Sequence, residues 1–508
     1  MANIDPRWGS WAEAPAPISE EDIRESLSCD VAVLGAGIAG VTCALCAAQM
    51  GLKVIVLEKG SSWSGRGGNI GVPNSKFMRA QGYENRLEDI AREWIKRCGN
   101  RCDEELLWLF LHNGERAMDW LLDIVTAPEY GCRPELQACI YRGETYREIY
   151  GSHRLFDGPM AKKGLRAGGA DAVYAMYCEA CKLGVTFLFN CPAVRLEKES
   201  GRVVSAIGQQ DDGYVRVKAA RGVVIATGDI GGNADMCHDL APLAERSAVK
   251  IYMPKGGNTG DGHRLGLWAG GAFEDGPFPL MLHPQAYHLA NYCFLFVDNN
   301  GKRFMNEDNF IQGKSIAMLR RRMTYAWSIM DGEWMKKVPE TLPYGGGLFW
   351  GRDCGPDENG FDEGYAESLM TRSRNAGYLV EADTPEELAE KMGVPVNNFT
   401  ETLRRHNEYA ALGRDEEFGK RPELLFPLDK PPYIALKFGP ALLAVVGGLK
   451  VNTDLNVTDD EGTAIPGLYA IGNAMGGRYG VDYPMLLPGN SHGTALTYGF
   501  ILGEKLAE

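Results

Sequence analysis

The stretch CDVAVLGAGIAGVTCALCAAQMGLKVIVLEKG, residues 29–60, decides the fold class. Its first apolar run predicts a buried strand entering a glycine-rich turn, the middle predicts a helix, and KVIVLE predicts a second buried strand. Two parallel strands joined by a helix form a βαβ unit, the core of a Rossmann-type dinucleotide-binding domain. We therefore expect an α/β protein built on a parallel sheet.

The turn carries the GxGxxG pattern at Gly35, Gly37 and Gly40, with Ile38 and Ala39 between the last two glycines. The first glycine permits the tight turn, the second lets the backbone approach a diphosphate, and the third lets helix and strand pack closely. The start of the helix offers free N–H groups and a positive dipole end to phosphates. The motif therefore predicts a dinucleotide site.

Glu58 ends the second strand, 18 residues after Gly40. This spacing is close to the ~20 residues expected for an acid that binds the ribose hydroxyls of a dinucleotide. An acid at this place disfavours the 2′-phosphate of NADP. The motif alone leaves both FAD and NAD open, because both cofactors use it.

The composition predicts an ordinary globular protein of two or three domains. The chain has 508 residues, of which 45% are hydrophobic and 24% charged, and its formal net charge is -14. This acidic balance argues against nucleic acid or an anionic membrane as the main partner. No apolar run approaches the ~18 residues of a membrane span, and the polar N-terminus lacks the features of a secretory signal. We expect a soluble, cytoplasmic protein.

The chain contains 13 cysteines, among them two CxxC pairs, Cys43/Cys46 and Cys178/Cys181. Both pairs lie in segments with a helical pattern. A zinc or iron–sulfur site would need clustered ligands in loops. We therefore expect reduced thiols that pack in the core, and no metal site.

Several distant segments resemble one flavoprotein family, and they occur in the family's order. Besides the βαβ unit they are GVVIATGDIGG at 222–232, GNTGDGHRLGLWAGGA at 257–272, LHP at 282–284, GKRFMNE at 301–307, and GGLKVNTDLNV with IPGLYAIGN at 447–457 and 465–473. Over nearly its whole length the chain resembles soluble fumarate reductases, urocanate reductases and 3-ketosteroid dehydrogenases. The resemblance implies FAD as the cofactor.

The same resemblance implies a Rossmann-type FAD-binding domain interrupted by an α+β domain that caps the substrate. We expect an N-terminal tail over 1–28, with a short helix capped by Ser19. The FAD-binding domain is expected over 29–279 and 437–508, and the capping domain over 280–436. The active site should lie between them, at the flavin face.

By the resemblance, the ADP half of FAD lies on Gly35, Gly37, Gly40, Glu58 and Lys59. The ribityl and flavin side is expected on Ser64, Gly67 and Gly68, near Ala226, Thr227 and Gly228, Asp261 of the TGDG turn, and Gly472 and Asn473. The last helix opens at Gly489, Asn490 and Ser491 and should point its positive end at the N1–C2=O edge of the flavin. The segment after Glu58 lacks the histidine that attaches FAD covalently in membrane-complex relatives, so non-covalent FAD is expected.

The chain departs from fumarate reductases where that family binds two carboxylates. Ala444 stands at the place of a histidine, Leu486 at that of a carboxylate-binding arginine, and Ile311 at that of the proton-donating arginine. A dicarboxylate buried against these side chains would leave charge unpaired, at a cost of roughly several kcal/mol. We therefore expect a ring-bearing, weakly charged substrate, in contact with Ala444, Leu486 and Gly489, in place of fumarate or succinate.

Tyr483, followed by Pro484 and Gly489, resembles the motif with which ketosteroid dehydrogenases hold a ring carbonyl, although two extra residues separate them here. A tyrosine with a pKa near ~10 stays protonated at neutral pH and polarises a carbonyl without a counter-charge. A core position is the alternative for Tyr483. His283 of LHP matches a family histidine beside the flavin, and Tyr287 follows in the same loop. The alternative for His283 is a core position with a hydrogen bond to the backbone, and the alternative for Tyr287 is a position on the surface.

Three further groups of side chains are left open by the sequence. His288 follows Tyr287, and His492 lies at the start of the last helix, where capping competes with catalysis. The irregular segment 126–165 contains four tyrosines, which either cover the pocket or lie on the surface: Tyr130, Tyr141, Tyr146 and Tyr150.

These features favour a reductase that transfers hydride from flavin to an activated C=C bond of a phenolic, isoflavonoid or steroid-like compound. The alternatives are a 3-ketosteroid dehydrogenase acting oxidatively, a flavin electron-transfer subunit without its own substrate, and NAD in the Rossmann site. The chain shows no second dinucleotide motif and no haem segment. Its electron donor is therefore left among NAD(P)H, free reduced flavin and a partner protein.

Overall fold

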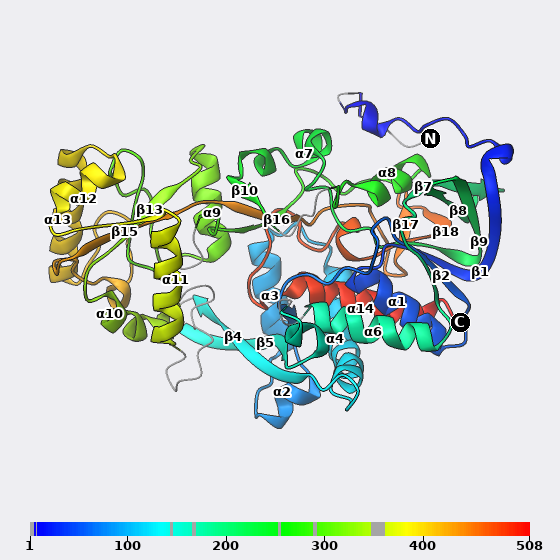
Figure 1. Ribbon diagram of the computed structural model, residues 1–508, viewed down its shortest axis with the longest axis horizontal. Helices are drawn as coiled ribbons and strands as arrows, with labels where there is room; N and C mark the ends of the chain where they lie inside the picture. Colours follow the sequence, from blue (N-terminus) through cyan, green and yellow to red (C-terminus); the bar gives the residue numbers. More distant parts are fainter. Residues whose placement is uncertain are drawn as a thin grey trace.

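The computed structural model describes residues 5–6, 8–142, 146–164, 169–251, 256–287, 292–346 and 361–508. Figure 1 shows two lobes, with the N- and C-terminal segments in the larger one and the strands and helices of residues 292–436 at the opposite end. Of the candidate residues, His288 lies outside the described residues, and the side chains of Tyr141 and Tyr146 are likewise not described.

The large lobe is built on a sheet with the strand order β17-β18-β9-β1-β2-β6. Strands β18, β9, β1, β2 and β6 run parallel, and β17, β7 and β8 add antiparallel pairs. The strand bounds are β1 (Ile23–Leu34), β2 (Val54–Leu57), β6 (Thr186–Leu188), β7 (Ala193–Glu199), β8 (Arg202–Gln210), β9 (Gly213–Ile225), β17 (Asn456–Thr458) and β18 (Ala464–Ala470). This parallel sheet confirms the expected α/β class.

The first strand begins earlier than the sequence pattern predicts. Strand β1 starts at Ile23, not near Cys29, and its first half pairs with residues 214–219 of β9. The side chains of this half are largely exposed, so the apolar run that reveals a buried strand begins only at Val31. The short helix capped by Ser19 is present as a 3-10 turn, Glu20–Asp22.

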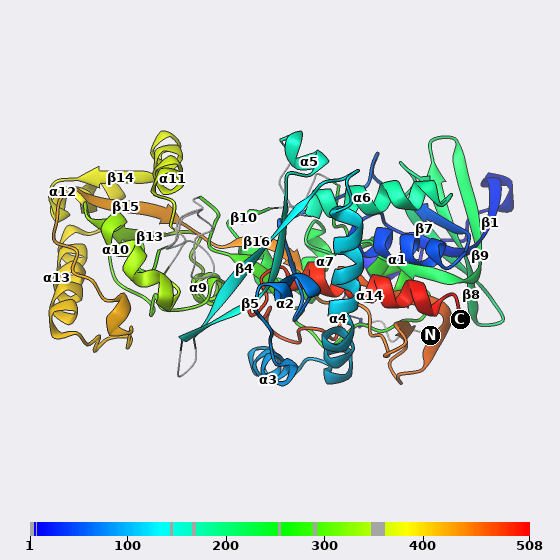
Figure 2. The ribbon, with the colours of Figure 1, turned by 90° about the horizontal axis from the view of Figure 1, so that it is seen from below.

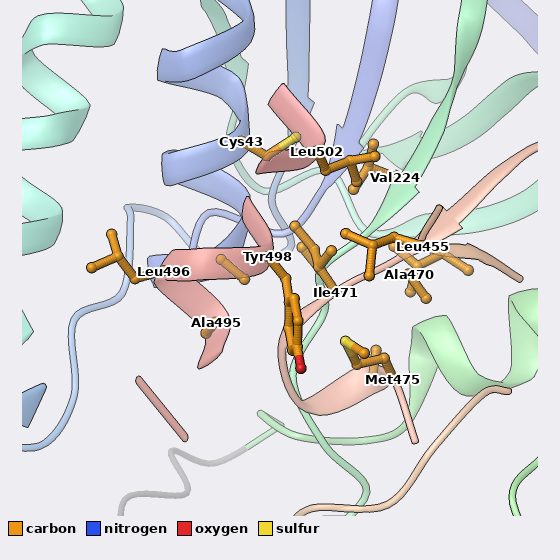
Figure 3. Close-up of a cluster of buried hydrophobic side chains, with 14 of the residues drawn as sticks. Cys43, Val224, Leu455, Ala470, Ile471, Met475, Ala495, Leu496, Tyr498 and Leu502 are labelled. Carbon is orange, nitrogen blue, oxygen red and sulfur yellow. The ribbon is translucent and has the colours of Figure 1, made fainter. Parts of the chain in front are cut away.

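Helices α1 (Ile38–Gln49) and α14 (Asn490–Lys505) lie side by side against this sheet (Figures 1 and 2). A Cβ atom at Gly499 would lie 2.7 Å from the carbonyl oxygen of Ala39, so glycine allows the close approach of the two helices. Figure 3 shows Cys43 of α1 next to Leu502 of α14 within this core. The pair Cys43/Cys46 is buried and serves packing, as expected.

Other helices surround the large lobe: α2 (Lys76–Ala80), α3 (Leu87–Arg97), α4 (Glu104–Val125), α5 (Pro159–Lys162), α6 (Gly169–Lys182), α7 (Ala234–Leu240) and α8 (Asp261–Trp268). A long hairpin of β4 (Arg133–Arg142) and β5 (Tyr146–Phe156) pairs with β3 (Asn69–Gly71) and extends toward the small lobe (Figure 2). Within the described ranges, no helix combines the length and apolar character needed to cross a bilayer.

The small lobe has its own antiparallel sheet and its own core. The sheet order is β12 (Leu295–Val297), β13 (Ala326–Met330), β15 (Tyr433–Phe438) and β14 (Leu379–Ala382). Its helices are α9 (Ile311–Arg320), α10 (Trp334–Thr341), α11 (Glu363–Asn375), α12 (Pro385–Met392) and α13 (Val396–Leu412). The GKRFMNE segment is structural here, because Arg303 forms a buried ion-pair group with Glu307 and Asp415.

A small sheet lies between the lobes, in the order β10 (Val249–Lys250), β16 (Ala441–Val445) and β11 (Leu280–His283). Strand β15 of the small lobe leads into β16 after two residues, so the chain passes from one lobe to the other at this point. Met281 pairs with Ala444, and His283 pairs with Ala441. This arrangement brings two candidate substrate residues, His283 and Ala444, to one sheet.

Candidate functional site

A cavity of about 940 Å³ opens where the parallel strands of the large lobe end. Its walls include the carboxyl ends of β1 and β2 at Leu34 and Leu57, and Ala226 just after β9. Ligands of open parallel sheets bind outside the carboxyl ends of the strands. The small sheet adds Met281 and Ala444 to the wall. The cavity therefore extends from the nucleotide motif to the junction of the lobes.

The three glycines of the motif have three different surroundings. Gly35 has φ +106°, and a Cβ atom there would lie 2.6 Å from the carbonyl oxygen of Ala226. A Cβ atom at Gly40 would lie 2.0 Å from the carbonyl oxygen of Gly35, so this glycine serves the packing of helix and strand. A Cβ atom at Gly37 would meet nothing within 4 Å, and Gly37 lines the cavity at the start of α1. The open space at a helix N-terminus fits the diphosphate of FAD.

Glu58 lines the cavity beside this loop. Its carboxylate accepts hydrogen bonds from the backbone N–H groups of Ala36 and Gly60, both at 2.7 Å. These contacts fix the carboxylate at the tip of β2, where an acid can bind ribose hydroxyls. The charge is thereby held in place before any ribose is bound.

Lys59 and Asp261 form an ion pair of 2.7 Å at the cavity wall, and Thr259 also accepts a hydrogen bond from Lys59. Burial raises the pKa of Asp261, but the charge of Lys59 and the hydrogen bonds to Asp261 outweigh it and lower that pKa overall. Arg264 also pairs with Asp261, at 2.7 Å, so this carboxylate is shared by two cations. We predicted Lys59 and Asp261 at the cofactor, and the structure adds that they pair with each other at the cavity wall.

The start of α14 forms the opposite end of the cavity. Its N-cap residue Gly489 has φ +82°, and a Cβ atom there would lie 2.3 Å from the carbonyl oxygen of Asn69. The ring of His492 donates its Nδ1–H to the same carbonyl at 2.8 Å, and burial lowers the pKa of His492. The imidazole is therefore neutral, and it lines the cavity. Asn490 does not line the cavity; its side chain donates to the carbonyl oxygen of Pro484 at 2.6 Å.

Tyr483 lines the cavity next to the start of α14. Its hydroxyl oxygen accepts a hydrogen bond of 3.1 Å from the backbone N–H of Ser491. Burial raises the pKa of Tyr483, although hydrogen bonds from the backbone and side chain of Ser491 act against it, so the hydroxyl stays protonated at neutral pH. The apolar residues that line the same cavity include Met281, Leu443, Ala444 and Met485, and His283 lines it as well.

The structure separates two candidate residues from this site. Leu486 is 1% exposed and packs in the core, and it does not line the cavity. Tyr287 lies against the rings of Tyr325 and Tyr378, and the Lys437 ammonium lies 4.7 Å from its ring centroid. It belongs to an aromatic cluster at the crossing between the lobes, so the expected roles in substrate contact and catalysis are not supported for Leu486 and Tyr287.

The residues expected to bind FAD lie in the cavity wall or next to it. Those that line it are Gly35, Gly37, Ile38, Ala39, Glu58, Lys59, Ser64, Gly67, Gly68, Ala226, Thr227, Gly228, Asp261, Gly472, Asn473, Gly489 and Ser491. Gly40 and Asn490 stand just behind the wall, in the packing of α1 and α14. Among the described residues no group of His, Cys, Asp or Glu could hold a metal ion.

Sequence reasoning missed several polar side chains of the cavity. The Arg66 Nη1 donates to the Oδ1 of Asn258 at 2.6 Å, and the Asn258 amide donates to Asp229. Burial raises the pKa of Asp229 to about 6. The sequence could have indicated Arg66, because it stands inside the glycine-rich segment GRGG. Asp229 and Asn258 are brought together only in the folded chain. Arg154 of the β4–β5 hairpin and Tyr365 of α11 also line the cavity.

Comparisons with known proteins agree with this geometry. A family model described as "FAD binding domain" matches residues 30–491. The chain is 27% identical to a vinyl phenol reductase of Lactiplantibacillus plantarum, over 95% of this chain and 97% of that protein. It is 25% identical to a 3-oxosteroid 1-dehydrogenase of Mycolicibacterium smegmatis, over 94% of this chain and 97% of that protein.

The fold has a counterpart among solved structures. The open conformation of a flavocytochrome c3 fumarate reductase superimposes with a TM-score of 0.69 at 23% identity, covering 98% of this chain and 82% of that chain. The expected family, the Rossmann-type FAD-binding fold and the cofactor are thus confirmed. The chain belongs to the FAD binding domain family and is an FAD-dependent oxidoreductase related to fumarate reductases and ketosteroid dehydrogenases.

Proposed function

We propose that this enzyme reduces an activated C=C bond of a ring-bearing, weakly charged compound, such as a phenolic, isoflavonoid or steroid-like molecule. The observation that carries the proposal is the Tyr483 hydroxyl in the cavity wall, held by the first turn of α14. Bound FAD supplies the hydride chemistry. The chain supplies a neutral donor for an oxygen of the substrate and an apolar surface for its ring.

The hydroxyl of Tyr483 has the geometry of a polarising group. Its oxygen accepts from the Ser491 N–H, and we propose that its own hydrogen is donated to a carbonyl or phenol oxygen of the substrate. A neutral donor suits an uncharged substrate, since no buried counter-charge is needed. His283 lines the same cavity, and we propose that it orients the substrate or moves the matching proton.

The side chains around Tyr483 favour a ring over a dicarboxylate. Ala444 and Met281 offer methyl and thioether surface, and Ala444 cannot bind a carboxylate. A relative named vinyl phenol reductase covers nearly the whole chain, which supports a phenolic substrate. A relative named 3-oxosteroid 1-dehydrogenase supports the second candidate, oxidation of a ring ketone in the same site.

We further propose that the cavity-lining residues of the glycine loop, with Glu58, hold the ADP half of non-covalent FAD. The end of the loop after β2, at Gly67 and Gly68, and the start of α14 would hold the flavin half, and Tyr483 and Ala444 line the same cavity. The large lobe then binds the cofactor, and the lobe of residues 280–436 closes the substrate side.

The proposal is tested by the reoxidation of reduced enzyme under anaerobic conditions. Dithionite supplies the electrons, so the test does not depend on whether the native donor is NAD(P)H, free reduced flavin or a partner protein. The flavin absorption near ~450 nm is followed after mixing with vinyl phenols, isoflavonoids, steroid enones or fumarate. We expect rapid reoxidation by ring compounds and slow reoxidation by fumarate. Equal or faster reoxidation by fumarate would refute the proposal, and dye-coupled oxidation of saturated ring ketones would favour the second candidate.

A further inference from the structure

Arg66 extends into the FAD cavity from a backbone that is fixed on both sides. The N–H of Ser64 donates to the carbonyl oxygen of Ala36 in the glycine loop, and the N–H of Gly169 at the start of α6 donates to that of Gly67. A Cβ atom at Gly169 would lie 2.1 Å from the Arg66 carbonyl oxygen, so these segments are in close contact. The side chain of Arg66 is therefore positioned by an anchored loop.

The guanidinium of Arg66 is held by a neutral group. Its Nη1 donates to the amide oxygen of Asn258 at 2.6 Å, and the amide nitrogen of Asn258 donates to Asp229. The other oxygen of Asp229 accepts from the Gly231 N–H at 2.7 Å. An amide thus separates the positive and negative groups, whereas Lys59 contacts the carboxylate of Asp261 directly. The charge of Arg66, which arginine keeps under all ordinary conditions, is available to an anion in the cavity.

The contacts of its loop place Arg66 between the two ends of the cavity. At the nucleotide end, the N–H of Ser64 donates to Ala36 of the glycine loop, and Thr259, next to Asn258, accepts from Lys59. At the other end, a Cβ atom at Gly67 would lie 2.6 Å from the ring of His492 in the first turn of α14. An FAD held by Glu58 at one end and by the start of α14 at the other would have its diphosphate between these two ends, beside the glycine loop.

We propose that Arg66 binds the diphosphate of FAD, exchanging the Asn258 amide for a phosphate oxygen, while Asn258 and Asp229 hold the guanidinium in position beforehand. Arginine pairs with phosphate through charge-assisted, often bidentate hydrogen bonds. The backbone N–H groups at the start of α1 then receive the diphosphate from one side and Arg66 from the other. This inference concerns the cofactor and does not depend on the proposed substrate.

The test compares ligands with and without phosphate. FAD and riboflavin are titrated into full-length protein stripped of flavin, and binding is followed by flavin fluorescence. We expect Arg66→Gln to weaken FAD binding about 10- to 100-fold and riboflavin binding by less than about 3-fold, because riboflavin has no phosphate. Arg66→Lys should retain part of the preference for FAD over riboflavin. Arg154→Gln, which removes an arginine from another wall of the same cavity, should leave the ratio of the two affinities unchanged.

A second variant tests the positioning by Asn258. Asn258→Asp places a carboxylate against the guanidinium, and the resulting ion pair should weaken FAD binding selectively, as Arg66→Gln does. If the stripped protein does not stay folded, the rate of FAD loss from the holoenzyme is measured instead, and it should rise in both variants. Equal losses for FAD and riboflavin in Arg66→Gln, or no loss, would overturn the inference. So would a changed flavin midpoint potential with an unchanged ratio of affinities, because it would place Arg66 at the flavin ring.

Discussion

Replacing Tyr483 by phenylalanine removes one hydroxyl group from the proposed substrate site and leaves the ring in place. The side chain lines the cavity and is otherwise packed, with only 2% of its surface exposed. Loss of one preorganised donor to a developing oxyanion typically slows an enzyme by about 10²- to 10³-fold. We therefore expect Tyr483→Phe to reoxidise about 10²- to 10³-fold more slowly with a vinyl phenol or an enone.

The same change has a structural effect that must be separated from the chemical one. The Ser491 N–H loses its acceptor at 3.1 Å, and an unsatisfied buried donor costs about 1–3 kcal/mol of stability. Tyr479→Phe is a matched control, because the Tyr479 hydroxyl is also buried and bonded, to Thr494 at 3.3 Å, but this residue does not line the cavity. It should lower the melting temperature without slowing reoxidation.

The assay mixes dithionite-reduced holoenzyme with substrate in a stopped-flow instrument and follows the flavin band. Rates are compared only between samples with equal flavin content, measured from the same spectrum. Reoxidation at the unmodified rate in Tyr483→Phe would remove the hydroxyl from the mechanism. A loss as large in Tyr479→Phe would show that the effect comes from packing around α14, and the reasoning would fail in that case too.

Five further substitutions provide three more tests. Gly37→Ala should fold normally but lose FAD on gel filtration, because the new Cβ atom contacts no protein atom and extends into the cavity. Gly40→Ala should lower the melting temperature, because its Cβ atom would collide with the carbonyl oxygen of Gly35. Ala444→His should be tolerated in the cavity wall, whereas Leu486→Arg should destabilise the fold by about 3 kcal/mol or more by burying an unpaired charge, as urea unfolding would show. Burial raises the pKa of Asp229 to about 6, above the ~3.9 of an aspartate in an unfolded chain. The folded protein therefore gains its full stabilisation from protonated Asp229 below about pH 4, and this stabilisation is lost as the pH rises through 6. The melting temperature of Asp229→Asn relative to the unmodified protein should therefore rise from pH 4 to pH 8; an equal difference at both pH values would contradict this assignment.

The nucleotide end of the site could be predicted from the sequence because its residues are close together in the chain. Gly35, Gly37 and Gly40 carry their roles in local backbone geometry, and Glu58 follows from the length of one βαβ unit. The position of Ile23 in β1 could not be predicted, since the exposed first half of that strand has no apolar pattern.

The substrate end depends on contacts between distant segments, and there the sequence was less informative. Leu486 stands three residues after Tyr483, yet one faces the core and the other lines the cavity, because the segment before α14 has no regular period. Tyr287 lies four residues after His283 but past the end of β11, where the chain turns toward the small lobe. No local pattern joins Arg66 to Asn258, which are 192 residues apart.

The contact between Tyr483 and Ser491 explains how one helix can serve both halves of the proposed reaction. The start of α14 lines the cavity at Gly489, Ser491 and His492, and the Ser491 N–H holds the tyrosine hydroxyl, whereas the N–H groups of Asn490, His492 and Gly493 bond to carbonyl oxygens of the preceding residues. Hydrogen bonds in a low-dielectric site strengthen one another along a chain. In the proposed arrangement, a substrate oxygen that accepts from Tyr483 would strengthen the contact of Tyr483 with the start of α14, and this one helix would position both the substrate oxygen and the flavin.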